Sequence, residues 1–314
     1  MTAGARPQVP RWLAVAAAVA VVTGGVASAC AEAGAAPPVV IGAGATAEQQ
    51  LLAAVAHEAV RRAGVPVEVR DGLGGTTGLR RQALADQVDL YWDYTGAAWT
   101  LGLRETAPPA DPLESWERVR EADADQGLRW LEASGANATF ALAVRRADLP
   151  RAAEQRGMGW LAGELSSGTR RLCADPDFLA RADGLPSLAA EYGIDTAGMP
   201  RRAATEDEAI RAVRAGGCFA GLVTATSGAA RASGLVPVED ELRVFPAFVV
   251  APVVREGSPA DRQSVEAALR RITGALDTPT LAQLNARVVD GADPVDVAAG
   301  FVDGLSRVDA TPAP

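Results

Sequence analysis

Strand patterns and helix patterns alternate along the chain from residue 39, and this alternation limits the possible folds more than any other feature. Val39–Gly42 has the apolar run of a short buried strand, and apolar residues at helical spacing predict a helix over Glu48–Arg62. Further strands are predicted at Val65–Val69 and Val88–Trp92, with a helix between them that follows a Gly-rich turn. Because strands that alternate with helices pair in parallel, the pattern predicts an α/β fold.

The middle and the end of the chain repeat this α/β pattern. Extended apolar segments at Thr139–Val144 and Leu242–Val254 flank the middle third, as expected of a chain that crosses to a second lobe and returns. We therefore expect a discontinuous first lobe (39–142 and 247–305), a second lobe (143–246) and a ligand site in the cleft between them. The other predicted elements are helices at Pro112–Asp123, around Phe178, Leu185–Tyr192, Glu206–Arg214, Asp261–Leu276, Thr278–Val289 and Pro294–Leu305, and strands at Arg170–Cys173 and Phe219–Val223.

The N-terminal residues have the pattern of an export signal. Arg6 and Arg11 give a basic start, and Trp12–Val22 is an uncharged apolar run, too short for the ~20 residues that span a bilayer. Small residues precede Cys30, as in the lipobox of bacterial lipoproteins, so we expect Cys30 to be lipidated. The alternative is an ordinary signal peptide followed by an incidental cysteine. The expected segments are a lipoprotein signal peptide (1–29), a lipid tether (30–38) and a flexible tail (306–314).

Charge and hydropathy limit the partners of the protein. The chain has a formal net charge of −9, and all 30 of its basic residues are Arg. An acidic chain of this kind is not expected to bind nucleic acid, which requires a basic surface. Because no segment after the signal is apolar for long enough to span a membrane, a permease that works with this protein is expected to be another polypeptide.

Few residues in the sequence are suited to catalysis or metal binding. His57 is the only histidine, and it lies in an Ala-rich helical stretch with no nucleophile motif nearby. No Cys-x-x-Cys pair is present, so we expect no metal site, no cofactor and no enzyme activity. Cys173 and Cys218 are expected to form a disulfide in an exported protein, the alternative being two small buried thiols.

Six motifs follow one another along roughly residues 39–305. They are Val40-Ile41-Gly42 with Glu48-Gln49; Asp89-Leu90-Tyr91-Trp92-Asp93-Tyr94-Thr95-Gly96; Asn137–Leu142; Pro176-Asp177-Phe178 with Arg181 and Asp183-Gly184-Leu185; Phe245–Phe248 with Ala251–Val254; and Leu284-Asn285-Ala286 with Asp293-Pro294. The second is the most distinctive: an aspartate, apolar residues, a carboxylate and then Tyr-Thr-Gly. In this order the motifs resemble the osmoprotectant substrate-binding proteins of ABC importers, the glycine betaine/choline/carnitine group.

The resemblance implies a two-lobed periplasmic-binding fold of type II with two crossover strands. It also implies a ligand with a quaternary ammonium group, which aromatic faces bind at about 0.5–2 kcal/mol each, and an Arg that binds a ligand carboxylate. The sequence departs from the family at several positions. Gly44 and Thr46 stand in the opening loop where the family usually has a Lys and an aromatic residue, and Ala97 stands where it often has Thr. Two positions that are usually Tyr are Phe here, and one aromatic position is Thr. Carried over by motif, the aromatic cage falls on Tyr94, Phe140, Phe178, Thr224 and Phe248, and the carboxylate-binding Arg is Arg181.

The aromatic candidates each have a structural alternative to ligand binding. Tyr94 ends a predicted parallel strand, and clefts form at such strand ends. Trp92 shares a strand face with Tyr94, so Trp92 either lines the cleft or fills the core. Phe140 and Phe248 lie on the crossovers and either contact the ligand or pack in the core.

The polar candidates also have structural alternatives to ligand binding. Arg181 lies one helical turn from Phe178, so the two can share a face; Arg181 either binds a ligand carboxylate or forms an ion pair with Asp183. Gly75 and Thr76 lie at a helix start, where backbone N–H groups can bind an anion. The charged run 201–208 is expected to be a solvated face.

These observations favour a solute receptor over an enzyme. We expect an exported protein, lipid-anchored on the outer face of the cytoplasmic membrane, monomeric, that binds glycine betaine, choline, carnitine or a similar solute for an ABC permease and ATPase. One alternative is a receptor for another betaine-like or aromatic cation. Another is a ligand-sensing lipoprotein without transport. A hydrolase on the same fold is disfavoured because the nucleophile–His pair is missing.

Overall fold

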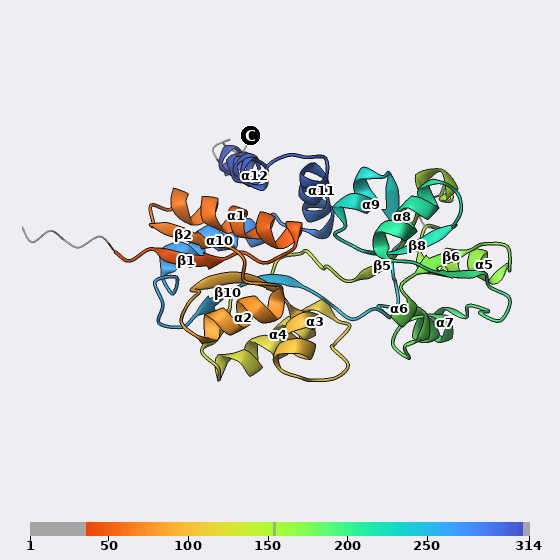
Figure 1. The fold of residues 1–314 in the computed structure, drawn as a ribbon, viewed down its shortest axis with the longest axis horizontal. Helices are drawn as coiled ribbons and strands as arrows, with labels where there is room; N and C mark the ends of the chain where they lie inside the picture. The colour runs from red at the N-terminus through yellow and green to blue at the C-terminus, as the bar shows by residue number, and fades with distance from the viewer. Residues whose placement is uncertain (1–35, 153–154, 310–314) are drawn as a thin grey trace, which may run out of the picture. The chain divides into compact units, whose positions relative to one another are not determined.

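Two five-stranded sheets organise the residues that the structure describes (Figure 1). The structure is a computed structural model of the 314-residue chain, and it describes residues 36–152 and 155–309. The described residues from Pro37 onward form one compact unit. The strands are β1 (Val39–Gly42), β2 (Val67–Arg70), β3 (Leu90–Tyr94), β4 (Leu128–Trp130), β5 (Phe140–Arg145), β6 (Leu172–Ala174), β7 (Arg201–Ala203), β8 (Ala220–Thr224), β9 (Leu235–Pro237) and β10 (Val250–Arg255).

The two sheets have the same strand pairing. The first, β2-β1-β3-β10-β4, holds β1, β2 and β3 in parallel, with β10 antiparallel between β3 and β4. The second, β7-β6-β8-β5-β9, holds β6, β7 and β8 in parallel, with β5 antiparallel between β8 and β9. Val250 of β10 lies opposite Tyr94, and Phe140 of β5 lies opposite Thr224. Tyr94 and Thr224 therefore occupy equivalent strand ends.

Helices cover the faces of both sheets. We call the first sheet with α1–α4 and α10–α12 the first lobe, and the second sheet with α5–α9 the second lobe. In Figure 1, α11 lies between α12 and α9, and α11 approaches the second lobe at Gly228 of α9. The helices are α1 (Ala47–Arg62), α2 (Thr76–Leu84), α3 (Thr95–Ala97), the π-helical turn η1 (Ala98–Gly102), α4 (Pro112–Ala124), the 3₁₀ turn η2 (Arg146–Asp148), α5 (Met158–Ser166), α6 (Pro176–Ala180), α7 (Leu185–Tyr192), α8 (Glu206–Arg214), α9 (Gly228–Ala232), α10 (Gln263–Thr273), α11 (Thr278–Val289) and α12 (Pro294–Asp309).

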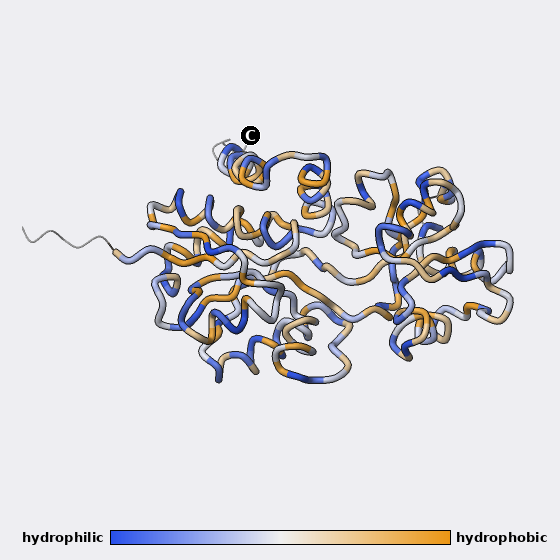
Figure 2. The backbone as a smooth tube through the Cα atoms, viewed as in Figure 1, coloured by the Kyte–Doolittle hydropathy of each residue, from blue (hydrophilic) through white to orange (hydrophobic). Residues whose placement is uncertain are grey.

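The core of the first lobe has a layer on each face of its sheet. Successive residues of a strand point to opposite faces, so Tyr91 packs with Leu79 on one side and Trp92 packs with Leu51 on the other. Figure 2 shows hydrophobic residues along β10, while α1 alternates between hydrophobic and hydrophilic residues. The alternation in α1 turns its apolar side to the sheet and its polar side to solvent.

A polar cluster is buried behind the last turn of β3. Arg80 donates two hydrogen bonds to Asp123, at 2.7 and 2.5 Å, and Trp130 donates a third at 2.7 Å. Asp93 is fully buried; one of its oxygens accepts the backbone N–H of Tyr94 at 2.8 Å, and the other has no partner among the described residues. Burial raises the pKa of Asp93 to about 7, although that N–H and the Arg80 charge oppose the shift.

Most predicted elements are present, and the differences have simple causes. The predicted extended run Leu242–Val254 is wrong in its first part, because the strand begins only at Val250. Short elements such as β7 (Arg201–Ala203), at the edge of its sheet and fully exposed, have no apolar periodicity and were not predicted. The second sheet begins at Phe140, inside the segment assigned to the first lobe. The final helix runs to Asp309, so the part of the predicted tail from Ser306 to Asp309 is helical.

The structure places a disulfide between Cys173 and Cys218, with their Cα atoms 5.9 Å apart. Cys173 lies on β6, and Cys218 comes two residues before β8, its parallel neighbour in the sheet. The expected signal peptide and the lipidation site Cys30 lie outside the described residues. None of the helices in the described part of the chain combines the length and the apolar character that a membrane span needs.

Candidate ligand-binding cleft

A cavity of about 800 Å³ lies between the two lobes. It is open at the carboxyl ends of β3 and β8 and at the first turns of α1 and α8, the edge at which ligands bind in α/β sheets. We call this cavity the cleft. Its lining includes Thr46, Glu48, Gln49, Thr76, Tyr94, Ala97, Ala138, Glu206, Asp207, Thr224, Thr226, Ser227, Phe248, Asn285 and Val289.

The Tyr-Thr-Gly motif joins β3 to the second crossover. Thr95 donates from its hydroxyl to the Ala247 carbonyl at 3.2 Å and accepts the Val249 N–H at 3.0 Å. A Cβ on Gly96 would lie 2.8 Å from both the Ala247 carbonyl oxygen and the Phe248 ring, so no larger residue fits there without a shift. Tyr94 projects into the cleft beside them. The motif therefore brings the Tyr94 and Phe248 side chains to one cavity wall.

Phe248 is also held from the first crossover. Its backbone N–H donates to the Asn137 side-chain oxygen at 2.7 Å, and its carbonyl accepts the Ala138 N–H at 2.9 Å. Asn137 in turn donates its own N–H to Thr278 at the start of α11, at 2.9 Å. The two crossovers thus pair with each other where they pass between the lobes, and they carry Ala138 and Phe248 into the cleft.

Glu48 is the acidic residue of the first-lobe wall. The α1 helix begins at a capping box in which Thr46 and Gln49 bind each other, and this fixes the first turn that carries Glu48. One oxygen of Glu48 accepts the Tyr94 hydroxyl at 2.7 Å, and the other accepts the Asn285 side-chain N–H at 2.5 Å. Burial, and then the charge of Glu48, raise the pKa of Tyr94 well above its usual value, so Tyr94 stays a neutral donor.

Asn285 connects this wall to the second lobe. Its side-chain N–H also donates to the Thr226 carbonyl at 2.9 Å, and a Cβ on Gly228 would lie 2.4 Å from its carbonyl carbon. The small residue therefore permits α9 to approach α11. Through Asn285, the carboxylate of Glu48 is coupled to the backbone of the opposite lobe.

Glu206 is the acidic residue of the second-lobe wall. It is the first residue of α8, whose capping box is formed by Thr205 and Glu208. One oxygen of Glu206 accepts the Thr224 hydroxyl at 3.1 Å and the Thr224 N–H at 3.3 Å. Each lobe thus ends its central parallel strand in a hydroxyl that donates to a carboxylate in the cleft. The run 201–208, predicted to be a solvated face, is largely exposed, but Glu206 in it is half-buried and lines the cleft.

Four phenylalanines form a cluster beside the cleft. The Phe140 ring centroid lies 6.3 Å from those of Phe178 and Phe245 and 6.5 Å from that of Phe248. Phe140 and Phe178 line an adjoining cavity of about 200 Å³, which shares Glu206 with the cleft. The predicted cage residues Phe140, Phe178 and Phe248 are therefore neighbours, and Phe245 was not among the predicted site residues.

Other predicted site residues take structural positions. Trp92, a predicted ligand contact, is 2% exposed and packs in the first-lobe core, because the strand face that it shares with Tyr94 is covered by α1 at that level. Gly75 caps α2 but does not line the cleft, whereas Thr76 does and accepts from Gln49 at 3.3 Å. Arg181 lines the adjoining cavity, yet both its contacts go to Asp183, at 2.9 Å.

The acidic residues of the site are not among the site residues predicted from the sequence. Glu48 was noted only as part of a motif, Glu206 only as part of a charged run, and Asn285 only as part of a C-terminal motif. A usable signal was present, because Thr46 and Thr205 each start a capping box that places the following Glu at a helix N-terminus. In an α/β fold, such helix starts lie at the same edge as the strand ends.

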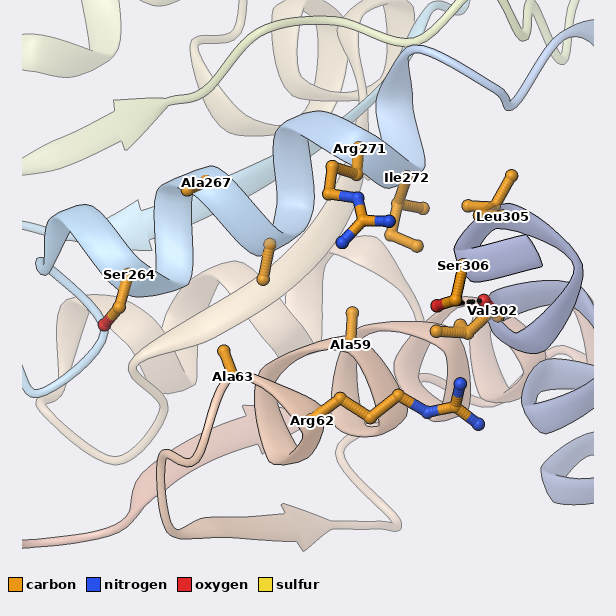
Figure 3. A pocket seen from close by; sticks show the side chains of 11 residues that line it. Ala59, Arg62, Ala63, Ser264, Ala267, Arg271, Ile272, Val302, Leu305 and Ser306 are labelled. Atoms are coloured by element: carbon orange, nitrogen blue, oxygen red, sulfur yellow. Dashed lines mark hydrogen bonds between the residues drawn. The ribbon is translucent and has the colours of Figure 1, made fainter. Parts of the chain in front are cut away.

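Of two other hollows, the smaller lies away from the cleft and the larger borders it at Ser227. One of about 260 Å³ lies between α1, α10 and α12, where Ala59, Ala63 and Ala267 leave space (Figure 3). Another of about 620 Å³ lies behind the crossovers, and at its rim Arg243 pairs with Asp111 across the lobes at 2.5 Å. Among the described residues, no group of His, Cys, Asp or Glu has the arrangement of a metal site.

Comparison with known proteins decides the family. Residues 37–304 match the model of the substrate-binding domain of ABC-type glycine betaine transport systems. The chain belongs to this family. It is 30% identical over 279 residues to the glycine betaine-binding protein YehZ of Escherichia coli, with 83% of this chain and 88% of that protein covered. It is 31% identical over 276 residues to a glycine-betaine-binding protein of Pseudomonas aeruginosa, covering 83% and 86%.

A solved structure supports the same assignment. The structure of apo YehZ from Escherichia coli matches with a TM-score of 0.77 at 29% identity, over 86% of this chain and 99% of that chain. The predicted two-lobed periplasmic-binding fold is thereby confirmed. As a member of this glycine betaine family, the protein is the extracytoplasmic substrate-binding component of an ABC transporter, and its partners are a small solute and a permease.

Proposed function

We propose that the cleft binds one small solute with a quaternary ammonium group, of the glycine betaine and choline type, for delivery to an ABC permease. The observation that carries this proposal is that Tyr94 and Phe248 line the same cavity as the carboxylates of Glu48 and Glu206. A quaternary ammonium has no N–H to donate, so it is bound by aromatic faces and by negative charge. A ring and a carboxylate side by side meet both requirements.

The remaining parts of the proposal are based on the predictions from the sequence. The protein catalyses no reaction, acts as a monomer, and is anchored through a lipid on Cys30 to the outer face of the cytoplasmic membrane. The relatives named as glycine betaine-binding proteins support the ligand class. Replacing Cys30 with Ser should release the protein from the membrane fraction, and an unchanged lipid mass on that variant would contradict the anchor.

Calorimetric titration of the purified soluble chain with glycine betaine and with choline tests the ligand. At 100 times its dissociation constant, a true ligand should stabilise the fold by about 2.7 kcal/mol. Phe248→Ala should weaken binding, and Phe248→Tyr, which keeps a ring, should not. If neither ligand binds and an aromatic cation does, the receptor belongs to another ligand class. If no cation binds, the proposed function is wrong.

A further inference from the structure

The cleft is lined by acidic residues without a base. Glu48, Glu206 and Asp207 contribute carboxylates, and none of the described residues that line it is Arg or His. Glu48 and Glu206 are half-buried, so water screens their charges less than it would at the surface. The ionisable side chains that line the cavity therefore carry a net negative charge.

The partners of the two glutamates are neutral. Glu48 accepts from the Tyr94 hydroxyl and the Asn285 amide, and Glu206 accepts from the hydroxyl and N–H of Thr224. In the part of the chain that the structure describes, no ion pair to either carboxylate is formed. Hydrogen bonds hold the two carboxylates in place, while their negative charges remain available to a cation in the cleft.

The base of the adjoining cavity that Phe140 and Phe178 line is already paired. Arg181 lines the adjoining cavity together with the carboxylate of Asp175, and its guanidinium is bound by both oxygens of Asp183. Its side chain is 52% exposed, so solvent reaches it freely. An anionic group on the ligand would have to compete with Asp183 for Arg181 and would lie close to Asp175 and Glu206.

We propose that the cleft selects solutes with a net positive charge, of the choline type, over zwitterions such as glycine betaine, and that Glu48 and Glu206 are the specificity-determining residues. This inference rests on the proposed function. In glycine betaine one methylene separates the ammonium from the carboxylate, so both groups must enter the same acidic cavity. Choline places a neutral hydroxyl there and meets no repulsion.

The test is titration of wild-type protein with choline chloride, glycine betaine and 3,3-dimethylbutan-1-ol, a neutral molecule of the shape of choline. We expect choline to bind at least tenfold more tightly than glycine betaine, and the neutral alcohol to bind far more weakly than choline. Glu206→Gln keeps an oxygen for Thr224 and should weaken choline at least fivefold while leaving glycine betaine unchanged or tighter. Glu48→Gln should act in the same direction.

The control is Glu121→Gln on the exposed face of α4, which removes the same charge far from the cleft and should change neither affinity. Thermal melting of each variant checks that it is folded. Glycine betaine binding as tightly as choline, or equal losses of both in Glu206→Gln, would overturn the inference and leave the proposed function standing. Failure of both ligands to bind the wild type would instead refute the proposed function.

Discussion

The two lobes share one strand arrangement but differ at equivalent positions. The central parallel strand ends in Asp93-Tyr94 in the first lobe and in Val223-Thr224 in the second, and both pairs face an antiparallel strand in the same register. In each lobe the terminal hydroxyl donates to a cleft carboxylate. The first lobe adds an aromatic ring and a buried acid, whereas the second has a small side chain and a buried valine.

The difference shows that one strand topology can place residues with different roles at equivalent positions of a site. The shared topology places a strand end and a helix start at the cleft in both lobes, whatever residues occupy them. The residues then decide the proposed roles: Tyr94 would offer a ring to the ligand, whereas Thr224 donates its hydroxyl to Glu206. The lobes also differ in their supports, since the second has shorter helices and a disulfide, and the first has the buried pair Arg80–Asp123.

The largest effect of a substitution at one fixed pH is expected from the disulfide. Replacing Cys173 and Cys218 with Ser opens a loop whose ends are 45 residues apart, and should lower the free energy of unfolding by about 2–4 kcal/mol. Urea titration followed by tryptophan fluorescence, to which Trp160 of the second lobe contributes, measures it. Reducing agent should destabilise the wild type and leave the double variant unchanged; two free thiols in the purified protein would refute the pairing.

The buried acid of the first lobe should make stability depend on pH. The pKa of Asp93 is about 7 in the folded protein and near 3.8 in the unfolded chain, so the folded state keeps a proton that the unfolded state releases. The contribution of Asp93 to stability is therefore fully present below about pH 4 and is lost as pH rises to 7, by at most about 1.4 kcal/mol per pH unit. Urea titrations from pH 5 to 8 should show this fall, and Asp93→Asn should flatten it. An identical slope in the variant would mean that Asp93 is ionised throughout.

Ligand binding should distinguish the two strand ends. Tyr94→Ala removes a ring that can contact the ammonium group, worth about 1–2 kcal/mol, or roughly five- to thirtyfold in affinity for choline. Thr224→Ala removes only a hydroxyl that positions Glu206, and should cost less. Titration of both variants makes the comparison, with Tyr94→Phe as a control that keeps the ring. Equal losses at the two positions would show that both lobes contribute in the same way.

The smallest effect is expected at Arg181. Its pair with Asp183 is exposed on both sides, and surface pairs of this kind contribute about 0–1 kcal/mol. Arg181→Ala should therefore shift the melting temperature little and leave the affinity for choline within about twofold. Melting curves and titration check both values. A strong loss of glycine betaine binding alone would show that Arg181 leaves Asp183 to bind the ligand carboxylate.

The sequence predicted the architecture well because the fold is encoded in local patterns. Apolar runs at strand spacing and helical spacing identified β1, α1, β3 and β8, and the Tyr-Thr-Gly motif located the cleft. The sequence patterns did not predict elements that are short or polar, such as the edge strand β7. It also assigned Trp92 to the site, because strand alternation alone does not say how far along a strand face the covering helix extends.

By itself, then, the sequence determined the fold class, the two crossings between lobes and the position of Tyr94 at a strand end. Only the tertiary structure decided which distant residues meet there. Glu48 and Asn285 are 237 residues apart and bind each other, and Glu206 comes to the cleft from the opposite lobe. The spacing of residues within one element carries no information on contacts between residues distant in the sequence. These contacts form only when the chain folds and α11 approaches α9. The negative charge of the cleft is therefore a property of the assembled lobes.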